Sequence, residues 1–138
     1  EDVPLSERTK KANEIYRESE KPCIYVSIHA NGFTKESAHG WGVYTSRGET
    51  KSDEIATILF NKAKAEFPAH KMRTDTYSDG DVDKEANFYV LIHTAMPAIL
   101  SENFFMTNER ECNLLMSQSG RDRIAKIHIE MINKIENE

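Results

Sequence analysis

Residues 23–33 read CIYVSIHANGF and carry the clearest strand signal in the chain. The apolar, partly β-branched run predicts a buried strand over residues 23–29. His29 closes this strand, and Asn31 follows it just before a glycine. An apolar strand that presents an imidazole and an amide at its tip needs a reason, because polar side chains are normally excluded from such strands.

The segments on either side alternate between helix and strand signals. Further strands are expected over residues 40–46, 87–93 and 97–104, where the sequence is apolar and aromatic. Apolar residues at helical spacing predict helices over residues 6–16, 51–67, 109–116 and 120–135. Strands alternating with amphipathic helices indicate an α/β fold with a largely parallel sheet. The polar stretch 69–86 is expected to be a long surface loop.

Three capping signals set the expected starts of the later helices. Asp53 follows Thr50 by three residues, as in a capping box. Glu111 follows Asn108 at the same spacing. The remaining pair, Ser119 and Asp122, predicts the start of the last helix.

Composition limits the classes of protein to consider. A chain of 138 residues, 38% hydrophobic and 30% charged, is long enough for one globular domain, which we place at residues 1–138. Its net charge of −5, without a Lys/Arg block, argues against nucleic acid as a partner. No apolar run approaches the ~18 residues of a membrane span. The two cysteines form neither a disulfide framework nor a CxxC metal motif.

Two polar side chains stand out at the expected strand ends. In open α/β sheets ligands collect beyond the carboxyl ends of the strands, where His29 and Glu102 are expected to lie. Glu102 follows the apolar run PAILS, although carboxylates are rarely buried unless paired. Each has a structural alternative: Glu102 as a cap or ion-pair partner, His29 as a satisfied strand-end histidine. Together they suggest a metal ligand and a general base for a metal-activated water.

Other candidates are weaker. His128 falls on the apolar face of the last expected helix, which favours a packed histidine over a ligand. His39 and His93 flank expected strands and are secondary candidates for substrate contact. The acidic run DGDVD, residues 79–83, lacks the glycine and glutamate spacing of a calcium loop and is interpreted as a solvated loop.

Five segments, in order along the chain, carry a family resemblance. They are LSERTKKAN (5–13), YVSIHANGF (25–33), GWGVYT (40–45), EANFYVL (85–91) and PAILSENFFMTN (97–108). In this order and spacing the chain resembles the zinc-dependent N-acetylmuramoyl-L-alanine amidases of bacterial cell walls and phage lysins. The resemblance implies a twisted, mostly parallel sheet with helices on both faces. It also implies zinc as cofactor, peptidoglycan as substrate, and a periplasmic, secreted or cell-wall location.

The resemblance assigns roles to particular residues. His29 matches the second histidine of the family's zinc triad, and Glu102 matches its catalytic glutamate. The implied reaction is hydrolysis of the amide between N-acetylmuramic acid and L-alanine, with Glu102 as general base. Asn31 and Asn103 are our candidates for substrate contact. The strand tip would then offer an imidazole to zinc while Ile24, Val26 and Ile28 anchor it in the core.

One departure from the family leaves a second function open. The family's other two zinc ligands, a His in a GHGG-like loop and a Glu on the next helix, lie upstream of the stretch matching residues 5–13. We therefore expect this domain to be N-terminally incomplete and to associate with the missing N-terminal segment. The alternative is a non-catalytic module of the same fold that binds peptidoglycan or a peptide through an incomplete zinc site.

Overall fold

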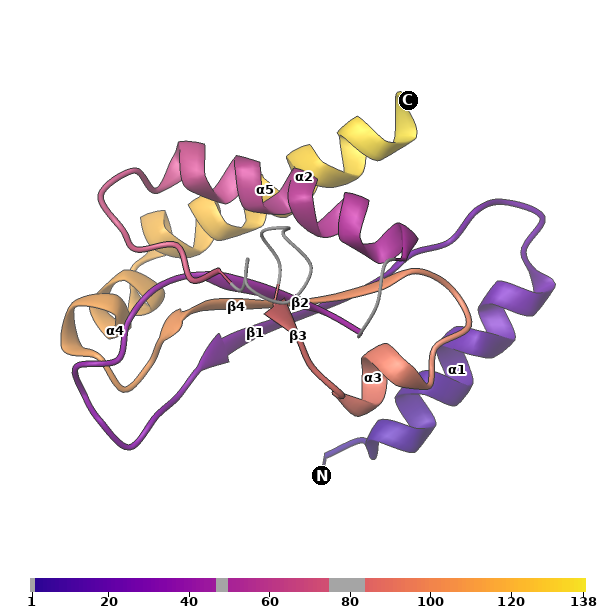
Figure 1. Cartoon of the computed structure of the whole chain (residues 1–138), viewed down its shortest axis with the longest axis horizontal. Coiled ribbons are helices and arrows are strands. Elements are labelled where there is room, and N and C mark those ends of the chain that lie inside the picture. The colour runs from indigo at the N-terminus through magenta and orange to yellow at the C-terminus, as the bar shows by residue number, and fades with distance from the viewer. Residues whose placement is uncertain (1, 47–49, 75–83) are drawn as a thin grey trace.

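The computed structural model describes residues 2–46, 50–74 and 84–138, and it shows one sheet between two layers of helices (Figure 1). The sheet has the strand order β1-β4-β2-β3. Its strands are β1 (Tyr25–Asn31), β2 (Gly42–Thr45), β3 (Lys84–Glu85) and β4 (Ala98–Phe105). The helices are α1 (Leu5–Glu18), α2 (Lys51–Glu66), α3 (Tyr89–Ile92), α4 (Glu109–Met116) and α5 (Gln118–Glu136). The α/β class expected from the sequence is confirmed.

The sheet is mixed. β1 runs parallel to β4 and β2 runs parallel to β3, whereas β2 is antiparallel to β4. Parallel pairing therefore dominates among the described strands, and the one antiparallel pair joins its two halves. Because β1 pairs only with β4 there, β1 forms one edge of the described sheet.

Helices cover both faces, as expected from the resemblance. α2 and α5 lie together on one face, and α1 and α3 lie on the other (Figure 1). The main core fills the space between the sheet and α2 and α5. Its buried side chains are Trp41, Val43, Ile55, Ala56, Leu59, Phe60, Ala63, Phe67, Ile99, Phe104, Ile124, Ile127 and Met131. A smaller cluster under α3 consists of Val90, Leu91, Ala98 and Leu100.

Local signals explain where several elements begin. The capping box at the start of α2 is confirmed, since the Thr50 hydroxyl accepts from the N–H of Ser52 and Asp53 accepts from the N–H of Thr50. The Asn108 cap of α4 is confirmed as well, because its side chain accepts from the N–H of Glu111. The predicted Ser119 cap is wrong. Ser117 is the N-cap of α5 and accepts from the N–H of Gly120 at 2.9 Å.

The strand predicted over residues 87–93 is also wrong. Within this run, Tyr89–Ile92 form the single helical turn α3. This turn packs on the face of the sheet that α1 covers and buries Val90 and Leu91 against β4 instead of joining the sheet. A short apolar run satisfies a strand or a buried helical turn equally well, so its pattern alone does not separate the two.

Two further expectations are modified. Ile24 and Val26 pack against the main core, but Ile28 is 57% exposed because β1 lies at the sheet edge. Of the expected loop 69–86, the described parts contain a bridge between Trp41 and Met72 and the strand β3. The remainder, including the DGDVD run, lies outside the described residues.

Candidate active site

His29 and Glu102 are direct neighbours across the pairing of β1 with β4. The two residues face each other in the parallel register, toward the carboxyl ends of their strands. Both side chains line one small cleft of about 130 Å³ on the face covered by α1 and α3. The cleft is lined by Leu5, Arg8, Ser27, His29, Phe88, Tyr89, Val90, Leu100 and Glu102. The structure thus brings together the two side chains that the sequence singled out.

Glu102 has the surroundings of a reactive carboxyl group. Its Oε2 atom is buried and has no hydrogen-bond partner among the described residues. Burial in this half-enclosed position raises the pKa of Glu102 from its ordinary 4.5 to about 7. A carboxyl group with a pKa near neutrality can both accept and return a proton at physiological pH, which general acid–base catalysis requires.

His29 offers an accessible imidazole. Its side chain is exposed, and its Nε2 atom lies 2.8 Å from the hydroxyl of Ser27, two residues earlier on the same face of β1. An exposed ring at the mouth of the cleft is free to approach a ligand from solvent. Within residues 2–46, 50–74 and 84–138, however, no three His, Cys, Asp or Glu side chains are grouped closely enough to hold a metal ion. The described donors therefore fit one part of a zinc site and not a complete one.

The two predicted substrate contacts occupy different surroundings. The Asn31 side chain accepts from the N–H of Gly32 at 2.9 Å, and its carbonyl accepts from Met106, so it lies at the rim where β1 ends. Asn103 is 2% exposed and faces the α2 and α5 side of the sheet, where it bonds Trp41 and Ser101. Asn103 does not line the cleft, and its contacts indicate a different role, considered below.

The secondary histidines lie outside the cleft. His39 contacts the carbonyl of Ser37 at 2.8 Å, and His93 stacks on Tyr89 with ring centroids 4.1 Å apart. His128 is buried against the core, which confirms the expectation of a packed histidine.

Sequence reasoning missed two residues of the cleft, Arg8 and Tyr89. Both belong to helices, α1 and α3, that pack on one face of the sheet. Their position next to β1 and β4 therefore depends on tertiary packing and not on a local sequence pattern. Arg8 lies within the segment 5–13 that carries the resemblance. It is the cationic side chain of the cleft and also pairs with Asp2 at 2.6 Å.

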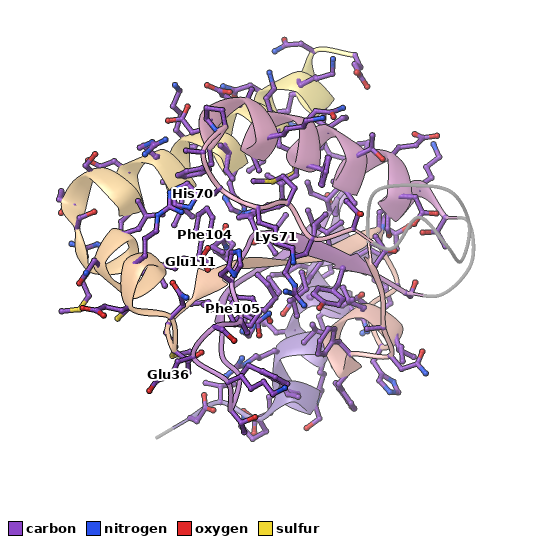
Figure 2. All side chains as sticks on the ribbon, turned by 60° about the vertical axis from the view of Figure 1, so that its left-hand side comes forward. Glu36, His70, Lys71, Phe104, Phe105 and Glu111 are labelled. Atoms are coloured by element: carbon purple, nitrogen blue, oxygen red, sulfur yellow. The ribbon has the colours of Figure 1, made fainter. Side chains whose placement is uncertain are left out.

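A polar cluster around Glu111 braces the end of β4. Figure 2 shows Glu111, from α4, close to His70 and Phe104. Glu111 is 2% exposed and accepts hydrogen bonds from Gly40 and Phe105. Burial, followed by the nearby Arg110, lowers the pKa of His70. This cluster lies on the opposite face from the cleft and fixes the loops that follow β4 and precede β2.

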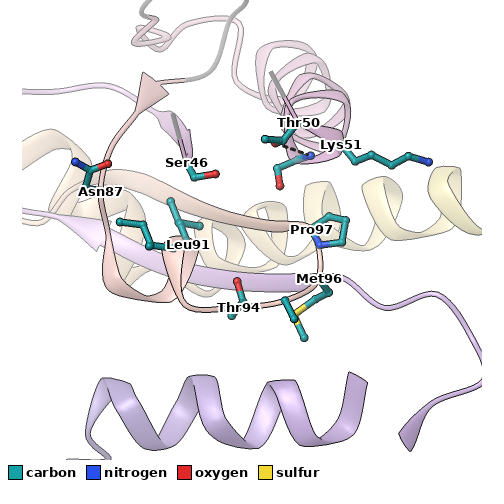
Figure 3. Close-up of a pocket in the computed structure, with 11 residues that line it drawn as sticks. Ser46, Thr50, Lys51, Asn87, Leu91, Thr94, Met96 and Pro97 are labelled. Carbon is teal, nitrogen blue, oxygen red and sulfur yellow. Dashed lines mark hydrogen bonds between the residues drawn. The ribbon is translucent and has the colours of Figure 1, made fainter. Parts of the chain in front are cut away.

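A larger cavity of about 560 Å³ lies at the start of α2 (Figure 3). It is lined by Ser46, Thr50, Lys51, Ser52, Asn87, Leu91, Ile92, Thr94, Ala95, Met96 and Pro97. Among the described residues that line it, Lys51 is the only charged one, and neither His29 nor Glu102 is part of this lining. Volume alone does not make an active site, so the smaller cleft with its paired titratable groups is the better candidate.

Fold and cleft together define an α/β domain with an imidazole and a half-buried carboxyl group side by side at the ends of two parallel strands. The family model of N-acetylmuramoyl-L-alanine amidases matches residues 1–134. The chain belongs to this family.

Individual relatives agree with that assignment. An endolysin of Bacillus phage SPP1 is 33% identical over 133 residues, which cover 96% of this chain and 45% of the relative. The N-acetylmuramoyl-L-alanine amidase AmiC of Neisseria meningitidis is 29% identical over 160 residues, covering 90% of this chain and 37% of the relative. The chain therefore spans less than half the length of these two relatives.

A solved structure shares the fold. The N-acetylmuramoyl-L-alanine amidase AmiC2 of Nostoc punctiforme matches with a TM-score of 0.82 at 25% identity, covering 99% of this chain and 67% of that one. In the described part of this chain, no helix has the length and apolar character needed to cross a membrane.

Proposed function

We propose that this chain carries the catalytic half-site of a zinc-dependent peptidoglycan amidase. The reaction is hydrolysis of the amide between N-acetylmuramic acid and L-alanine. The observation that carries the proposal is the pairing of His29 with Glu102 in one cleft, where the carboxyl group is desolvated and its Oε2 has no hydrogen-bond partner among the described residues. Family membership supports the substrate class.

In this proposal Glu102 moves the proton. As general base it takes a proton from the attacking water, and as general acid it returns that proton to the leaving amine of L-alanine. In the zinc-free protein desolvation raises its pKa to about 7, so the carboxyl group holds a proton more readily than an exposed glutamate does. Arg8 and Tyr89 line the same cleft and would contact the muramoyl peptide. Asn31, at the end of β1, stays a candidate for a further contact.

His29 would supply one ligand to zinc, and the remaining ligands would come from outside the described residues. Zinc held there would supply Lewis-acid chemistry, polarising the scissile carbonyl and lowering the pKa of a water. His29 must therefore hold its ring toward the cleft beside Glu102, which the register of β1 with β4 favours. With peptidoglycan as substrate, we place the protein outside the cytoplasmic membrane, in the periplasm, cell wall or medium.

The incomplete donor set favours one competing function. A module that binds peptidoglycan or a peptide without cleaving it would need no three-ligand group, and none occurs among the described residues. Such a module would have no use for a desolvated carboxyl group next to His29, which is why we place catalysis first.

The test uses the full-length protein loaded with zinc and a defined muramoyl peptide. Glu102→Gln should lower turnover by ~10²–10⁴-fold, the usual size of a general acid–base contribution. His29→Ala should remove most of the bound zinc, because too few ligands would remain. Glu109→Gln and His39→Ala are matched controls, since both side chains are exposed and outside the cleft. A protein that binds the peptide but does not release a peptide with a free L-alanine amino group would be a binding module. Near-normal turnover by Glu102→Gln would exclude the proposed mechanism.

A further inference from the structure

A chain of buried hydrogen bonds connects α5 to the backbone of His29. Asn103 is its central member: its Nδ2 donates to the carbonyl of His29 and to the hydroxyl of Ser101, each at 3.0 Å. Its Oδ1 accepts from the indole N–H of Trp41 at 2.8 Å. Both amide protons and the amide oxygen are therefore used, and Asn103 itself is 2% exposed.

The direction of every bond in this chain is fixed. Nδ1 of His128 lies 2.7 Å from the carbonyl of Ile124, which can only accept, so Nδ1 carries the proton. Burial lowers the pKa of His128, and in the neutral ring Nε2 is then an acceptor. The Ser101 hydroxyl, 2.8 Å away, must donate to that nitrogen. Its oxygen is left to accept from Asn103.

The same reasoning fixes the orientation of the Asn103 amide. A flipped amide would set its oxygen against the carbonyl of His29, two acceptors together. It would also set its nitrogen against the indole N–H of Trp41, two donors together. Either contact leaves a buried polar group unsatisfied, which costs about 1–3 kcal/mol. The amide is thus locked with one proton aimed at His29.

The bond to His29 occurs where the strands lose register. His29 pairs with Glu102, but Asn31 pairs with Phe105, so β4 holds an extra residue at this point. Phe104 takes up the irregularity with a φ of +68° and points into the main core. Bulges next to active sites commonly re-aim side chains. Here the bulge follows Glu102 directly, with Asn103 bonding across to β1.

We propose that Asn103 is a positioning residue that fixes the backbone of His29 and so the direction of its imidazole. The inference rests on the proposed function in one respect, namely that His29 is a zinc ligand. Glu102 faces the cleft from one side of β4, while Asn103 holds the partner strand from the other side. Groups that orient metal ligands are worth about 10–100-fold in metal affinity.

The test compares zinc dissociation constants of the full-length protein, measured by competition with a chromophoric chelator. Asn103→Leu keeps the approximate size of the side chain but removes the donor to His29, and it should weaken zinc binding by about 10–100-fold. Trp41→Phe is the matched control: it removes a bond to the same amide but leaves the donor to His29 in place. It should lower thermal stability while changing zinc affinity less than about threefold, well below that range.

A second readout does not involve zinc. The carbonyl carbon resonance of His29 should shift in Asn103→Leu and stay in place in Trp41→Phe. In the unchanged protein the two Asn103 amide protons should be inequivalent and slow to exchange, which can be measured even if the variants fold poorly. Fast exchange of these protons would overturn the proposal.

The zinc affinities of these variants also distinguish this inference from the proposed function. If His29→Ala abolishes tight zinc binding while folded Asn103→Leu binds zinc normally, the positioning role alone is wrong. If His29→Ala retains full zinc affinity, His29 is not a ligand, and both the zinc assignment and the positioning role fail.

Discussion

Both carboxylate oxygens of Glu111 lie 2.9 Å from the backbone N–H of Gly40, which donates to them. One of the oxygens, Oε1, also accepts from the N–H of Phe105 at 2.9 Å. A single buried carboxylate, 71 positions after Gly40 in the sequence, thus joins the loop before β2 to the end of β4. Gly40 has a φ of +120°, and a Cβ there would lie 3.0 Å from the carbonyl of Lys71. Glycine at position 40 therefore permits the close approach of the two backbone segments that Glu111 stabilises.

Replacing Glu111 should destabilise the fold. In Glu111→Gln one oxygen becomes an N–H₂ group. At the Oε2 position this donor would face the N–H of Gly40, and at the Oε1 position it would face the N–H groups of Gly40 and Phe105, so either orientation sets buried donors against each other. We expect the free energy of unfolding to fall by about 1–3 kcal/mol for each unsatisfied donor, measured by urea denaturation. Glu109→Gln, an exposed change in the same first turn of α4, should stay within ~0.5 kcal/mol of the unchanged protein. Equal stability of the two variants would show that Glu111 does not brace β4.

The start of α5 provides a paired test of capping. Ser117→Ala removes the acceptor for the N–H of Gly120 and should cost about 1 kcal/mol. Ser119→Ala, two residues later and exposed, should change the free energy of unfolding by less than ~0.5 kcal/mol. The reverse order of effects would restore Ser119 as the cap.

Acid should weaken the fold through buried histidines. Burial lowers the pKa of His128 below 6.5, so its neutral form is favoured in the folded state. That contribution is complete above pH 6.5 and is lost as pH falls through the folded-state pKa. We expect His128→Gln to lose less thermal stability than the unchanged protein on acidification below pH 6.5. Part of the loss should remain, because burial also lowers the pKa of His70. An unchanged pH profile would argue against a neutral His128 in the network.

Local signals predicted much of this fold because they act within a few residues. The capping box at Thr50, the Asn108 cap and the apolar run leading to Glu102 each determine a short element by themselves, and each is present in the structure. The run at 87–93 failed for the opposite reason. Its two buried side chains, Val90 and Leu91, could be buried in a strand or in a helical turn, and packing against Ala98 and Leu100 selects the helical turn.

The site was predictable only in part for the same physical reason. His29 and Glu102 stand out because each is a polar side chain on an apolar strand. Arg8 and Tyr89 reach the cleft only through the packing of α1 and α3. Asn103 follows Glu102 directly and was a candidate for substrate contact. β4 continues to Phe105, and alternation of side chains then turns Asn103 toward the core.

The burial of Glu102 should appear in the stability of the zinc-free protein. Its pKa is about 7 in the folded state and near 4.5 when exposed, so the folded state favours the protonated form. Its contribution is therefore fully present below pH 4.5 and is lost as pH rises through 7. Glu102→Gln cannot ionise, and its stability relative to the unchanged protein should rise as pH increases from 4.5 to above 7.

Chemical denaturation at several pH values, with zinc removed by a chelator, measures this difference. Glu109→Gln corrects for the loss of one negative charge from a chain of net charge −5. Adding zinc sharpens the test, because a cation next to a carboxylate favours its ionised form and should shrink the advantage of Glu102→Gln at high pH. If the advantage does not grow with pH in the zinc-free protein, the carboxyl group is not desolvated. If it grows but zinc leaves it unchanged, the metal does not bind beside Glu102, and the pairing of His29 with Glu102 has another purpose.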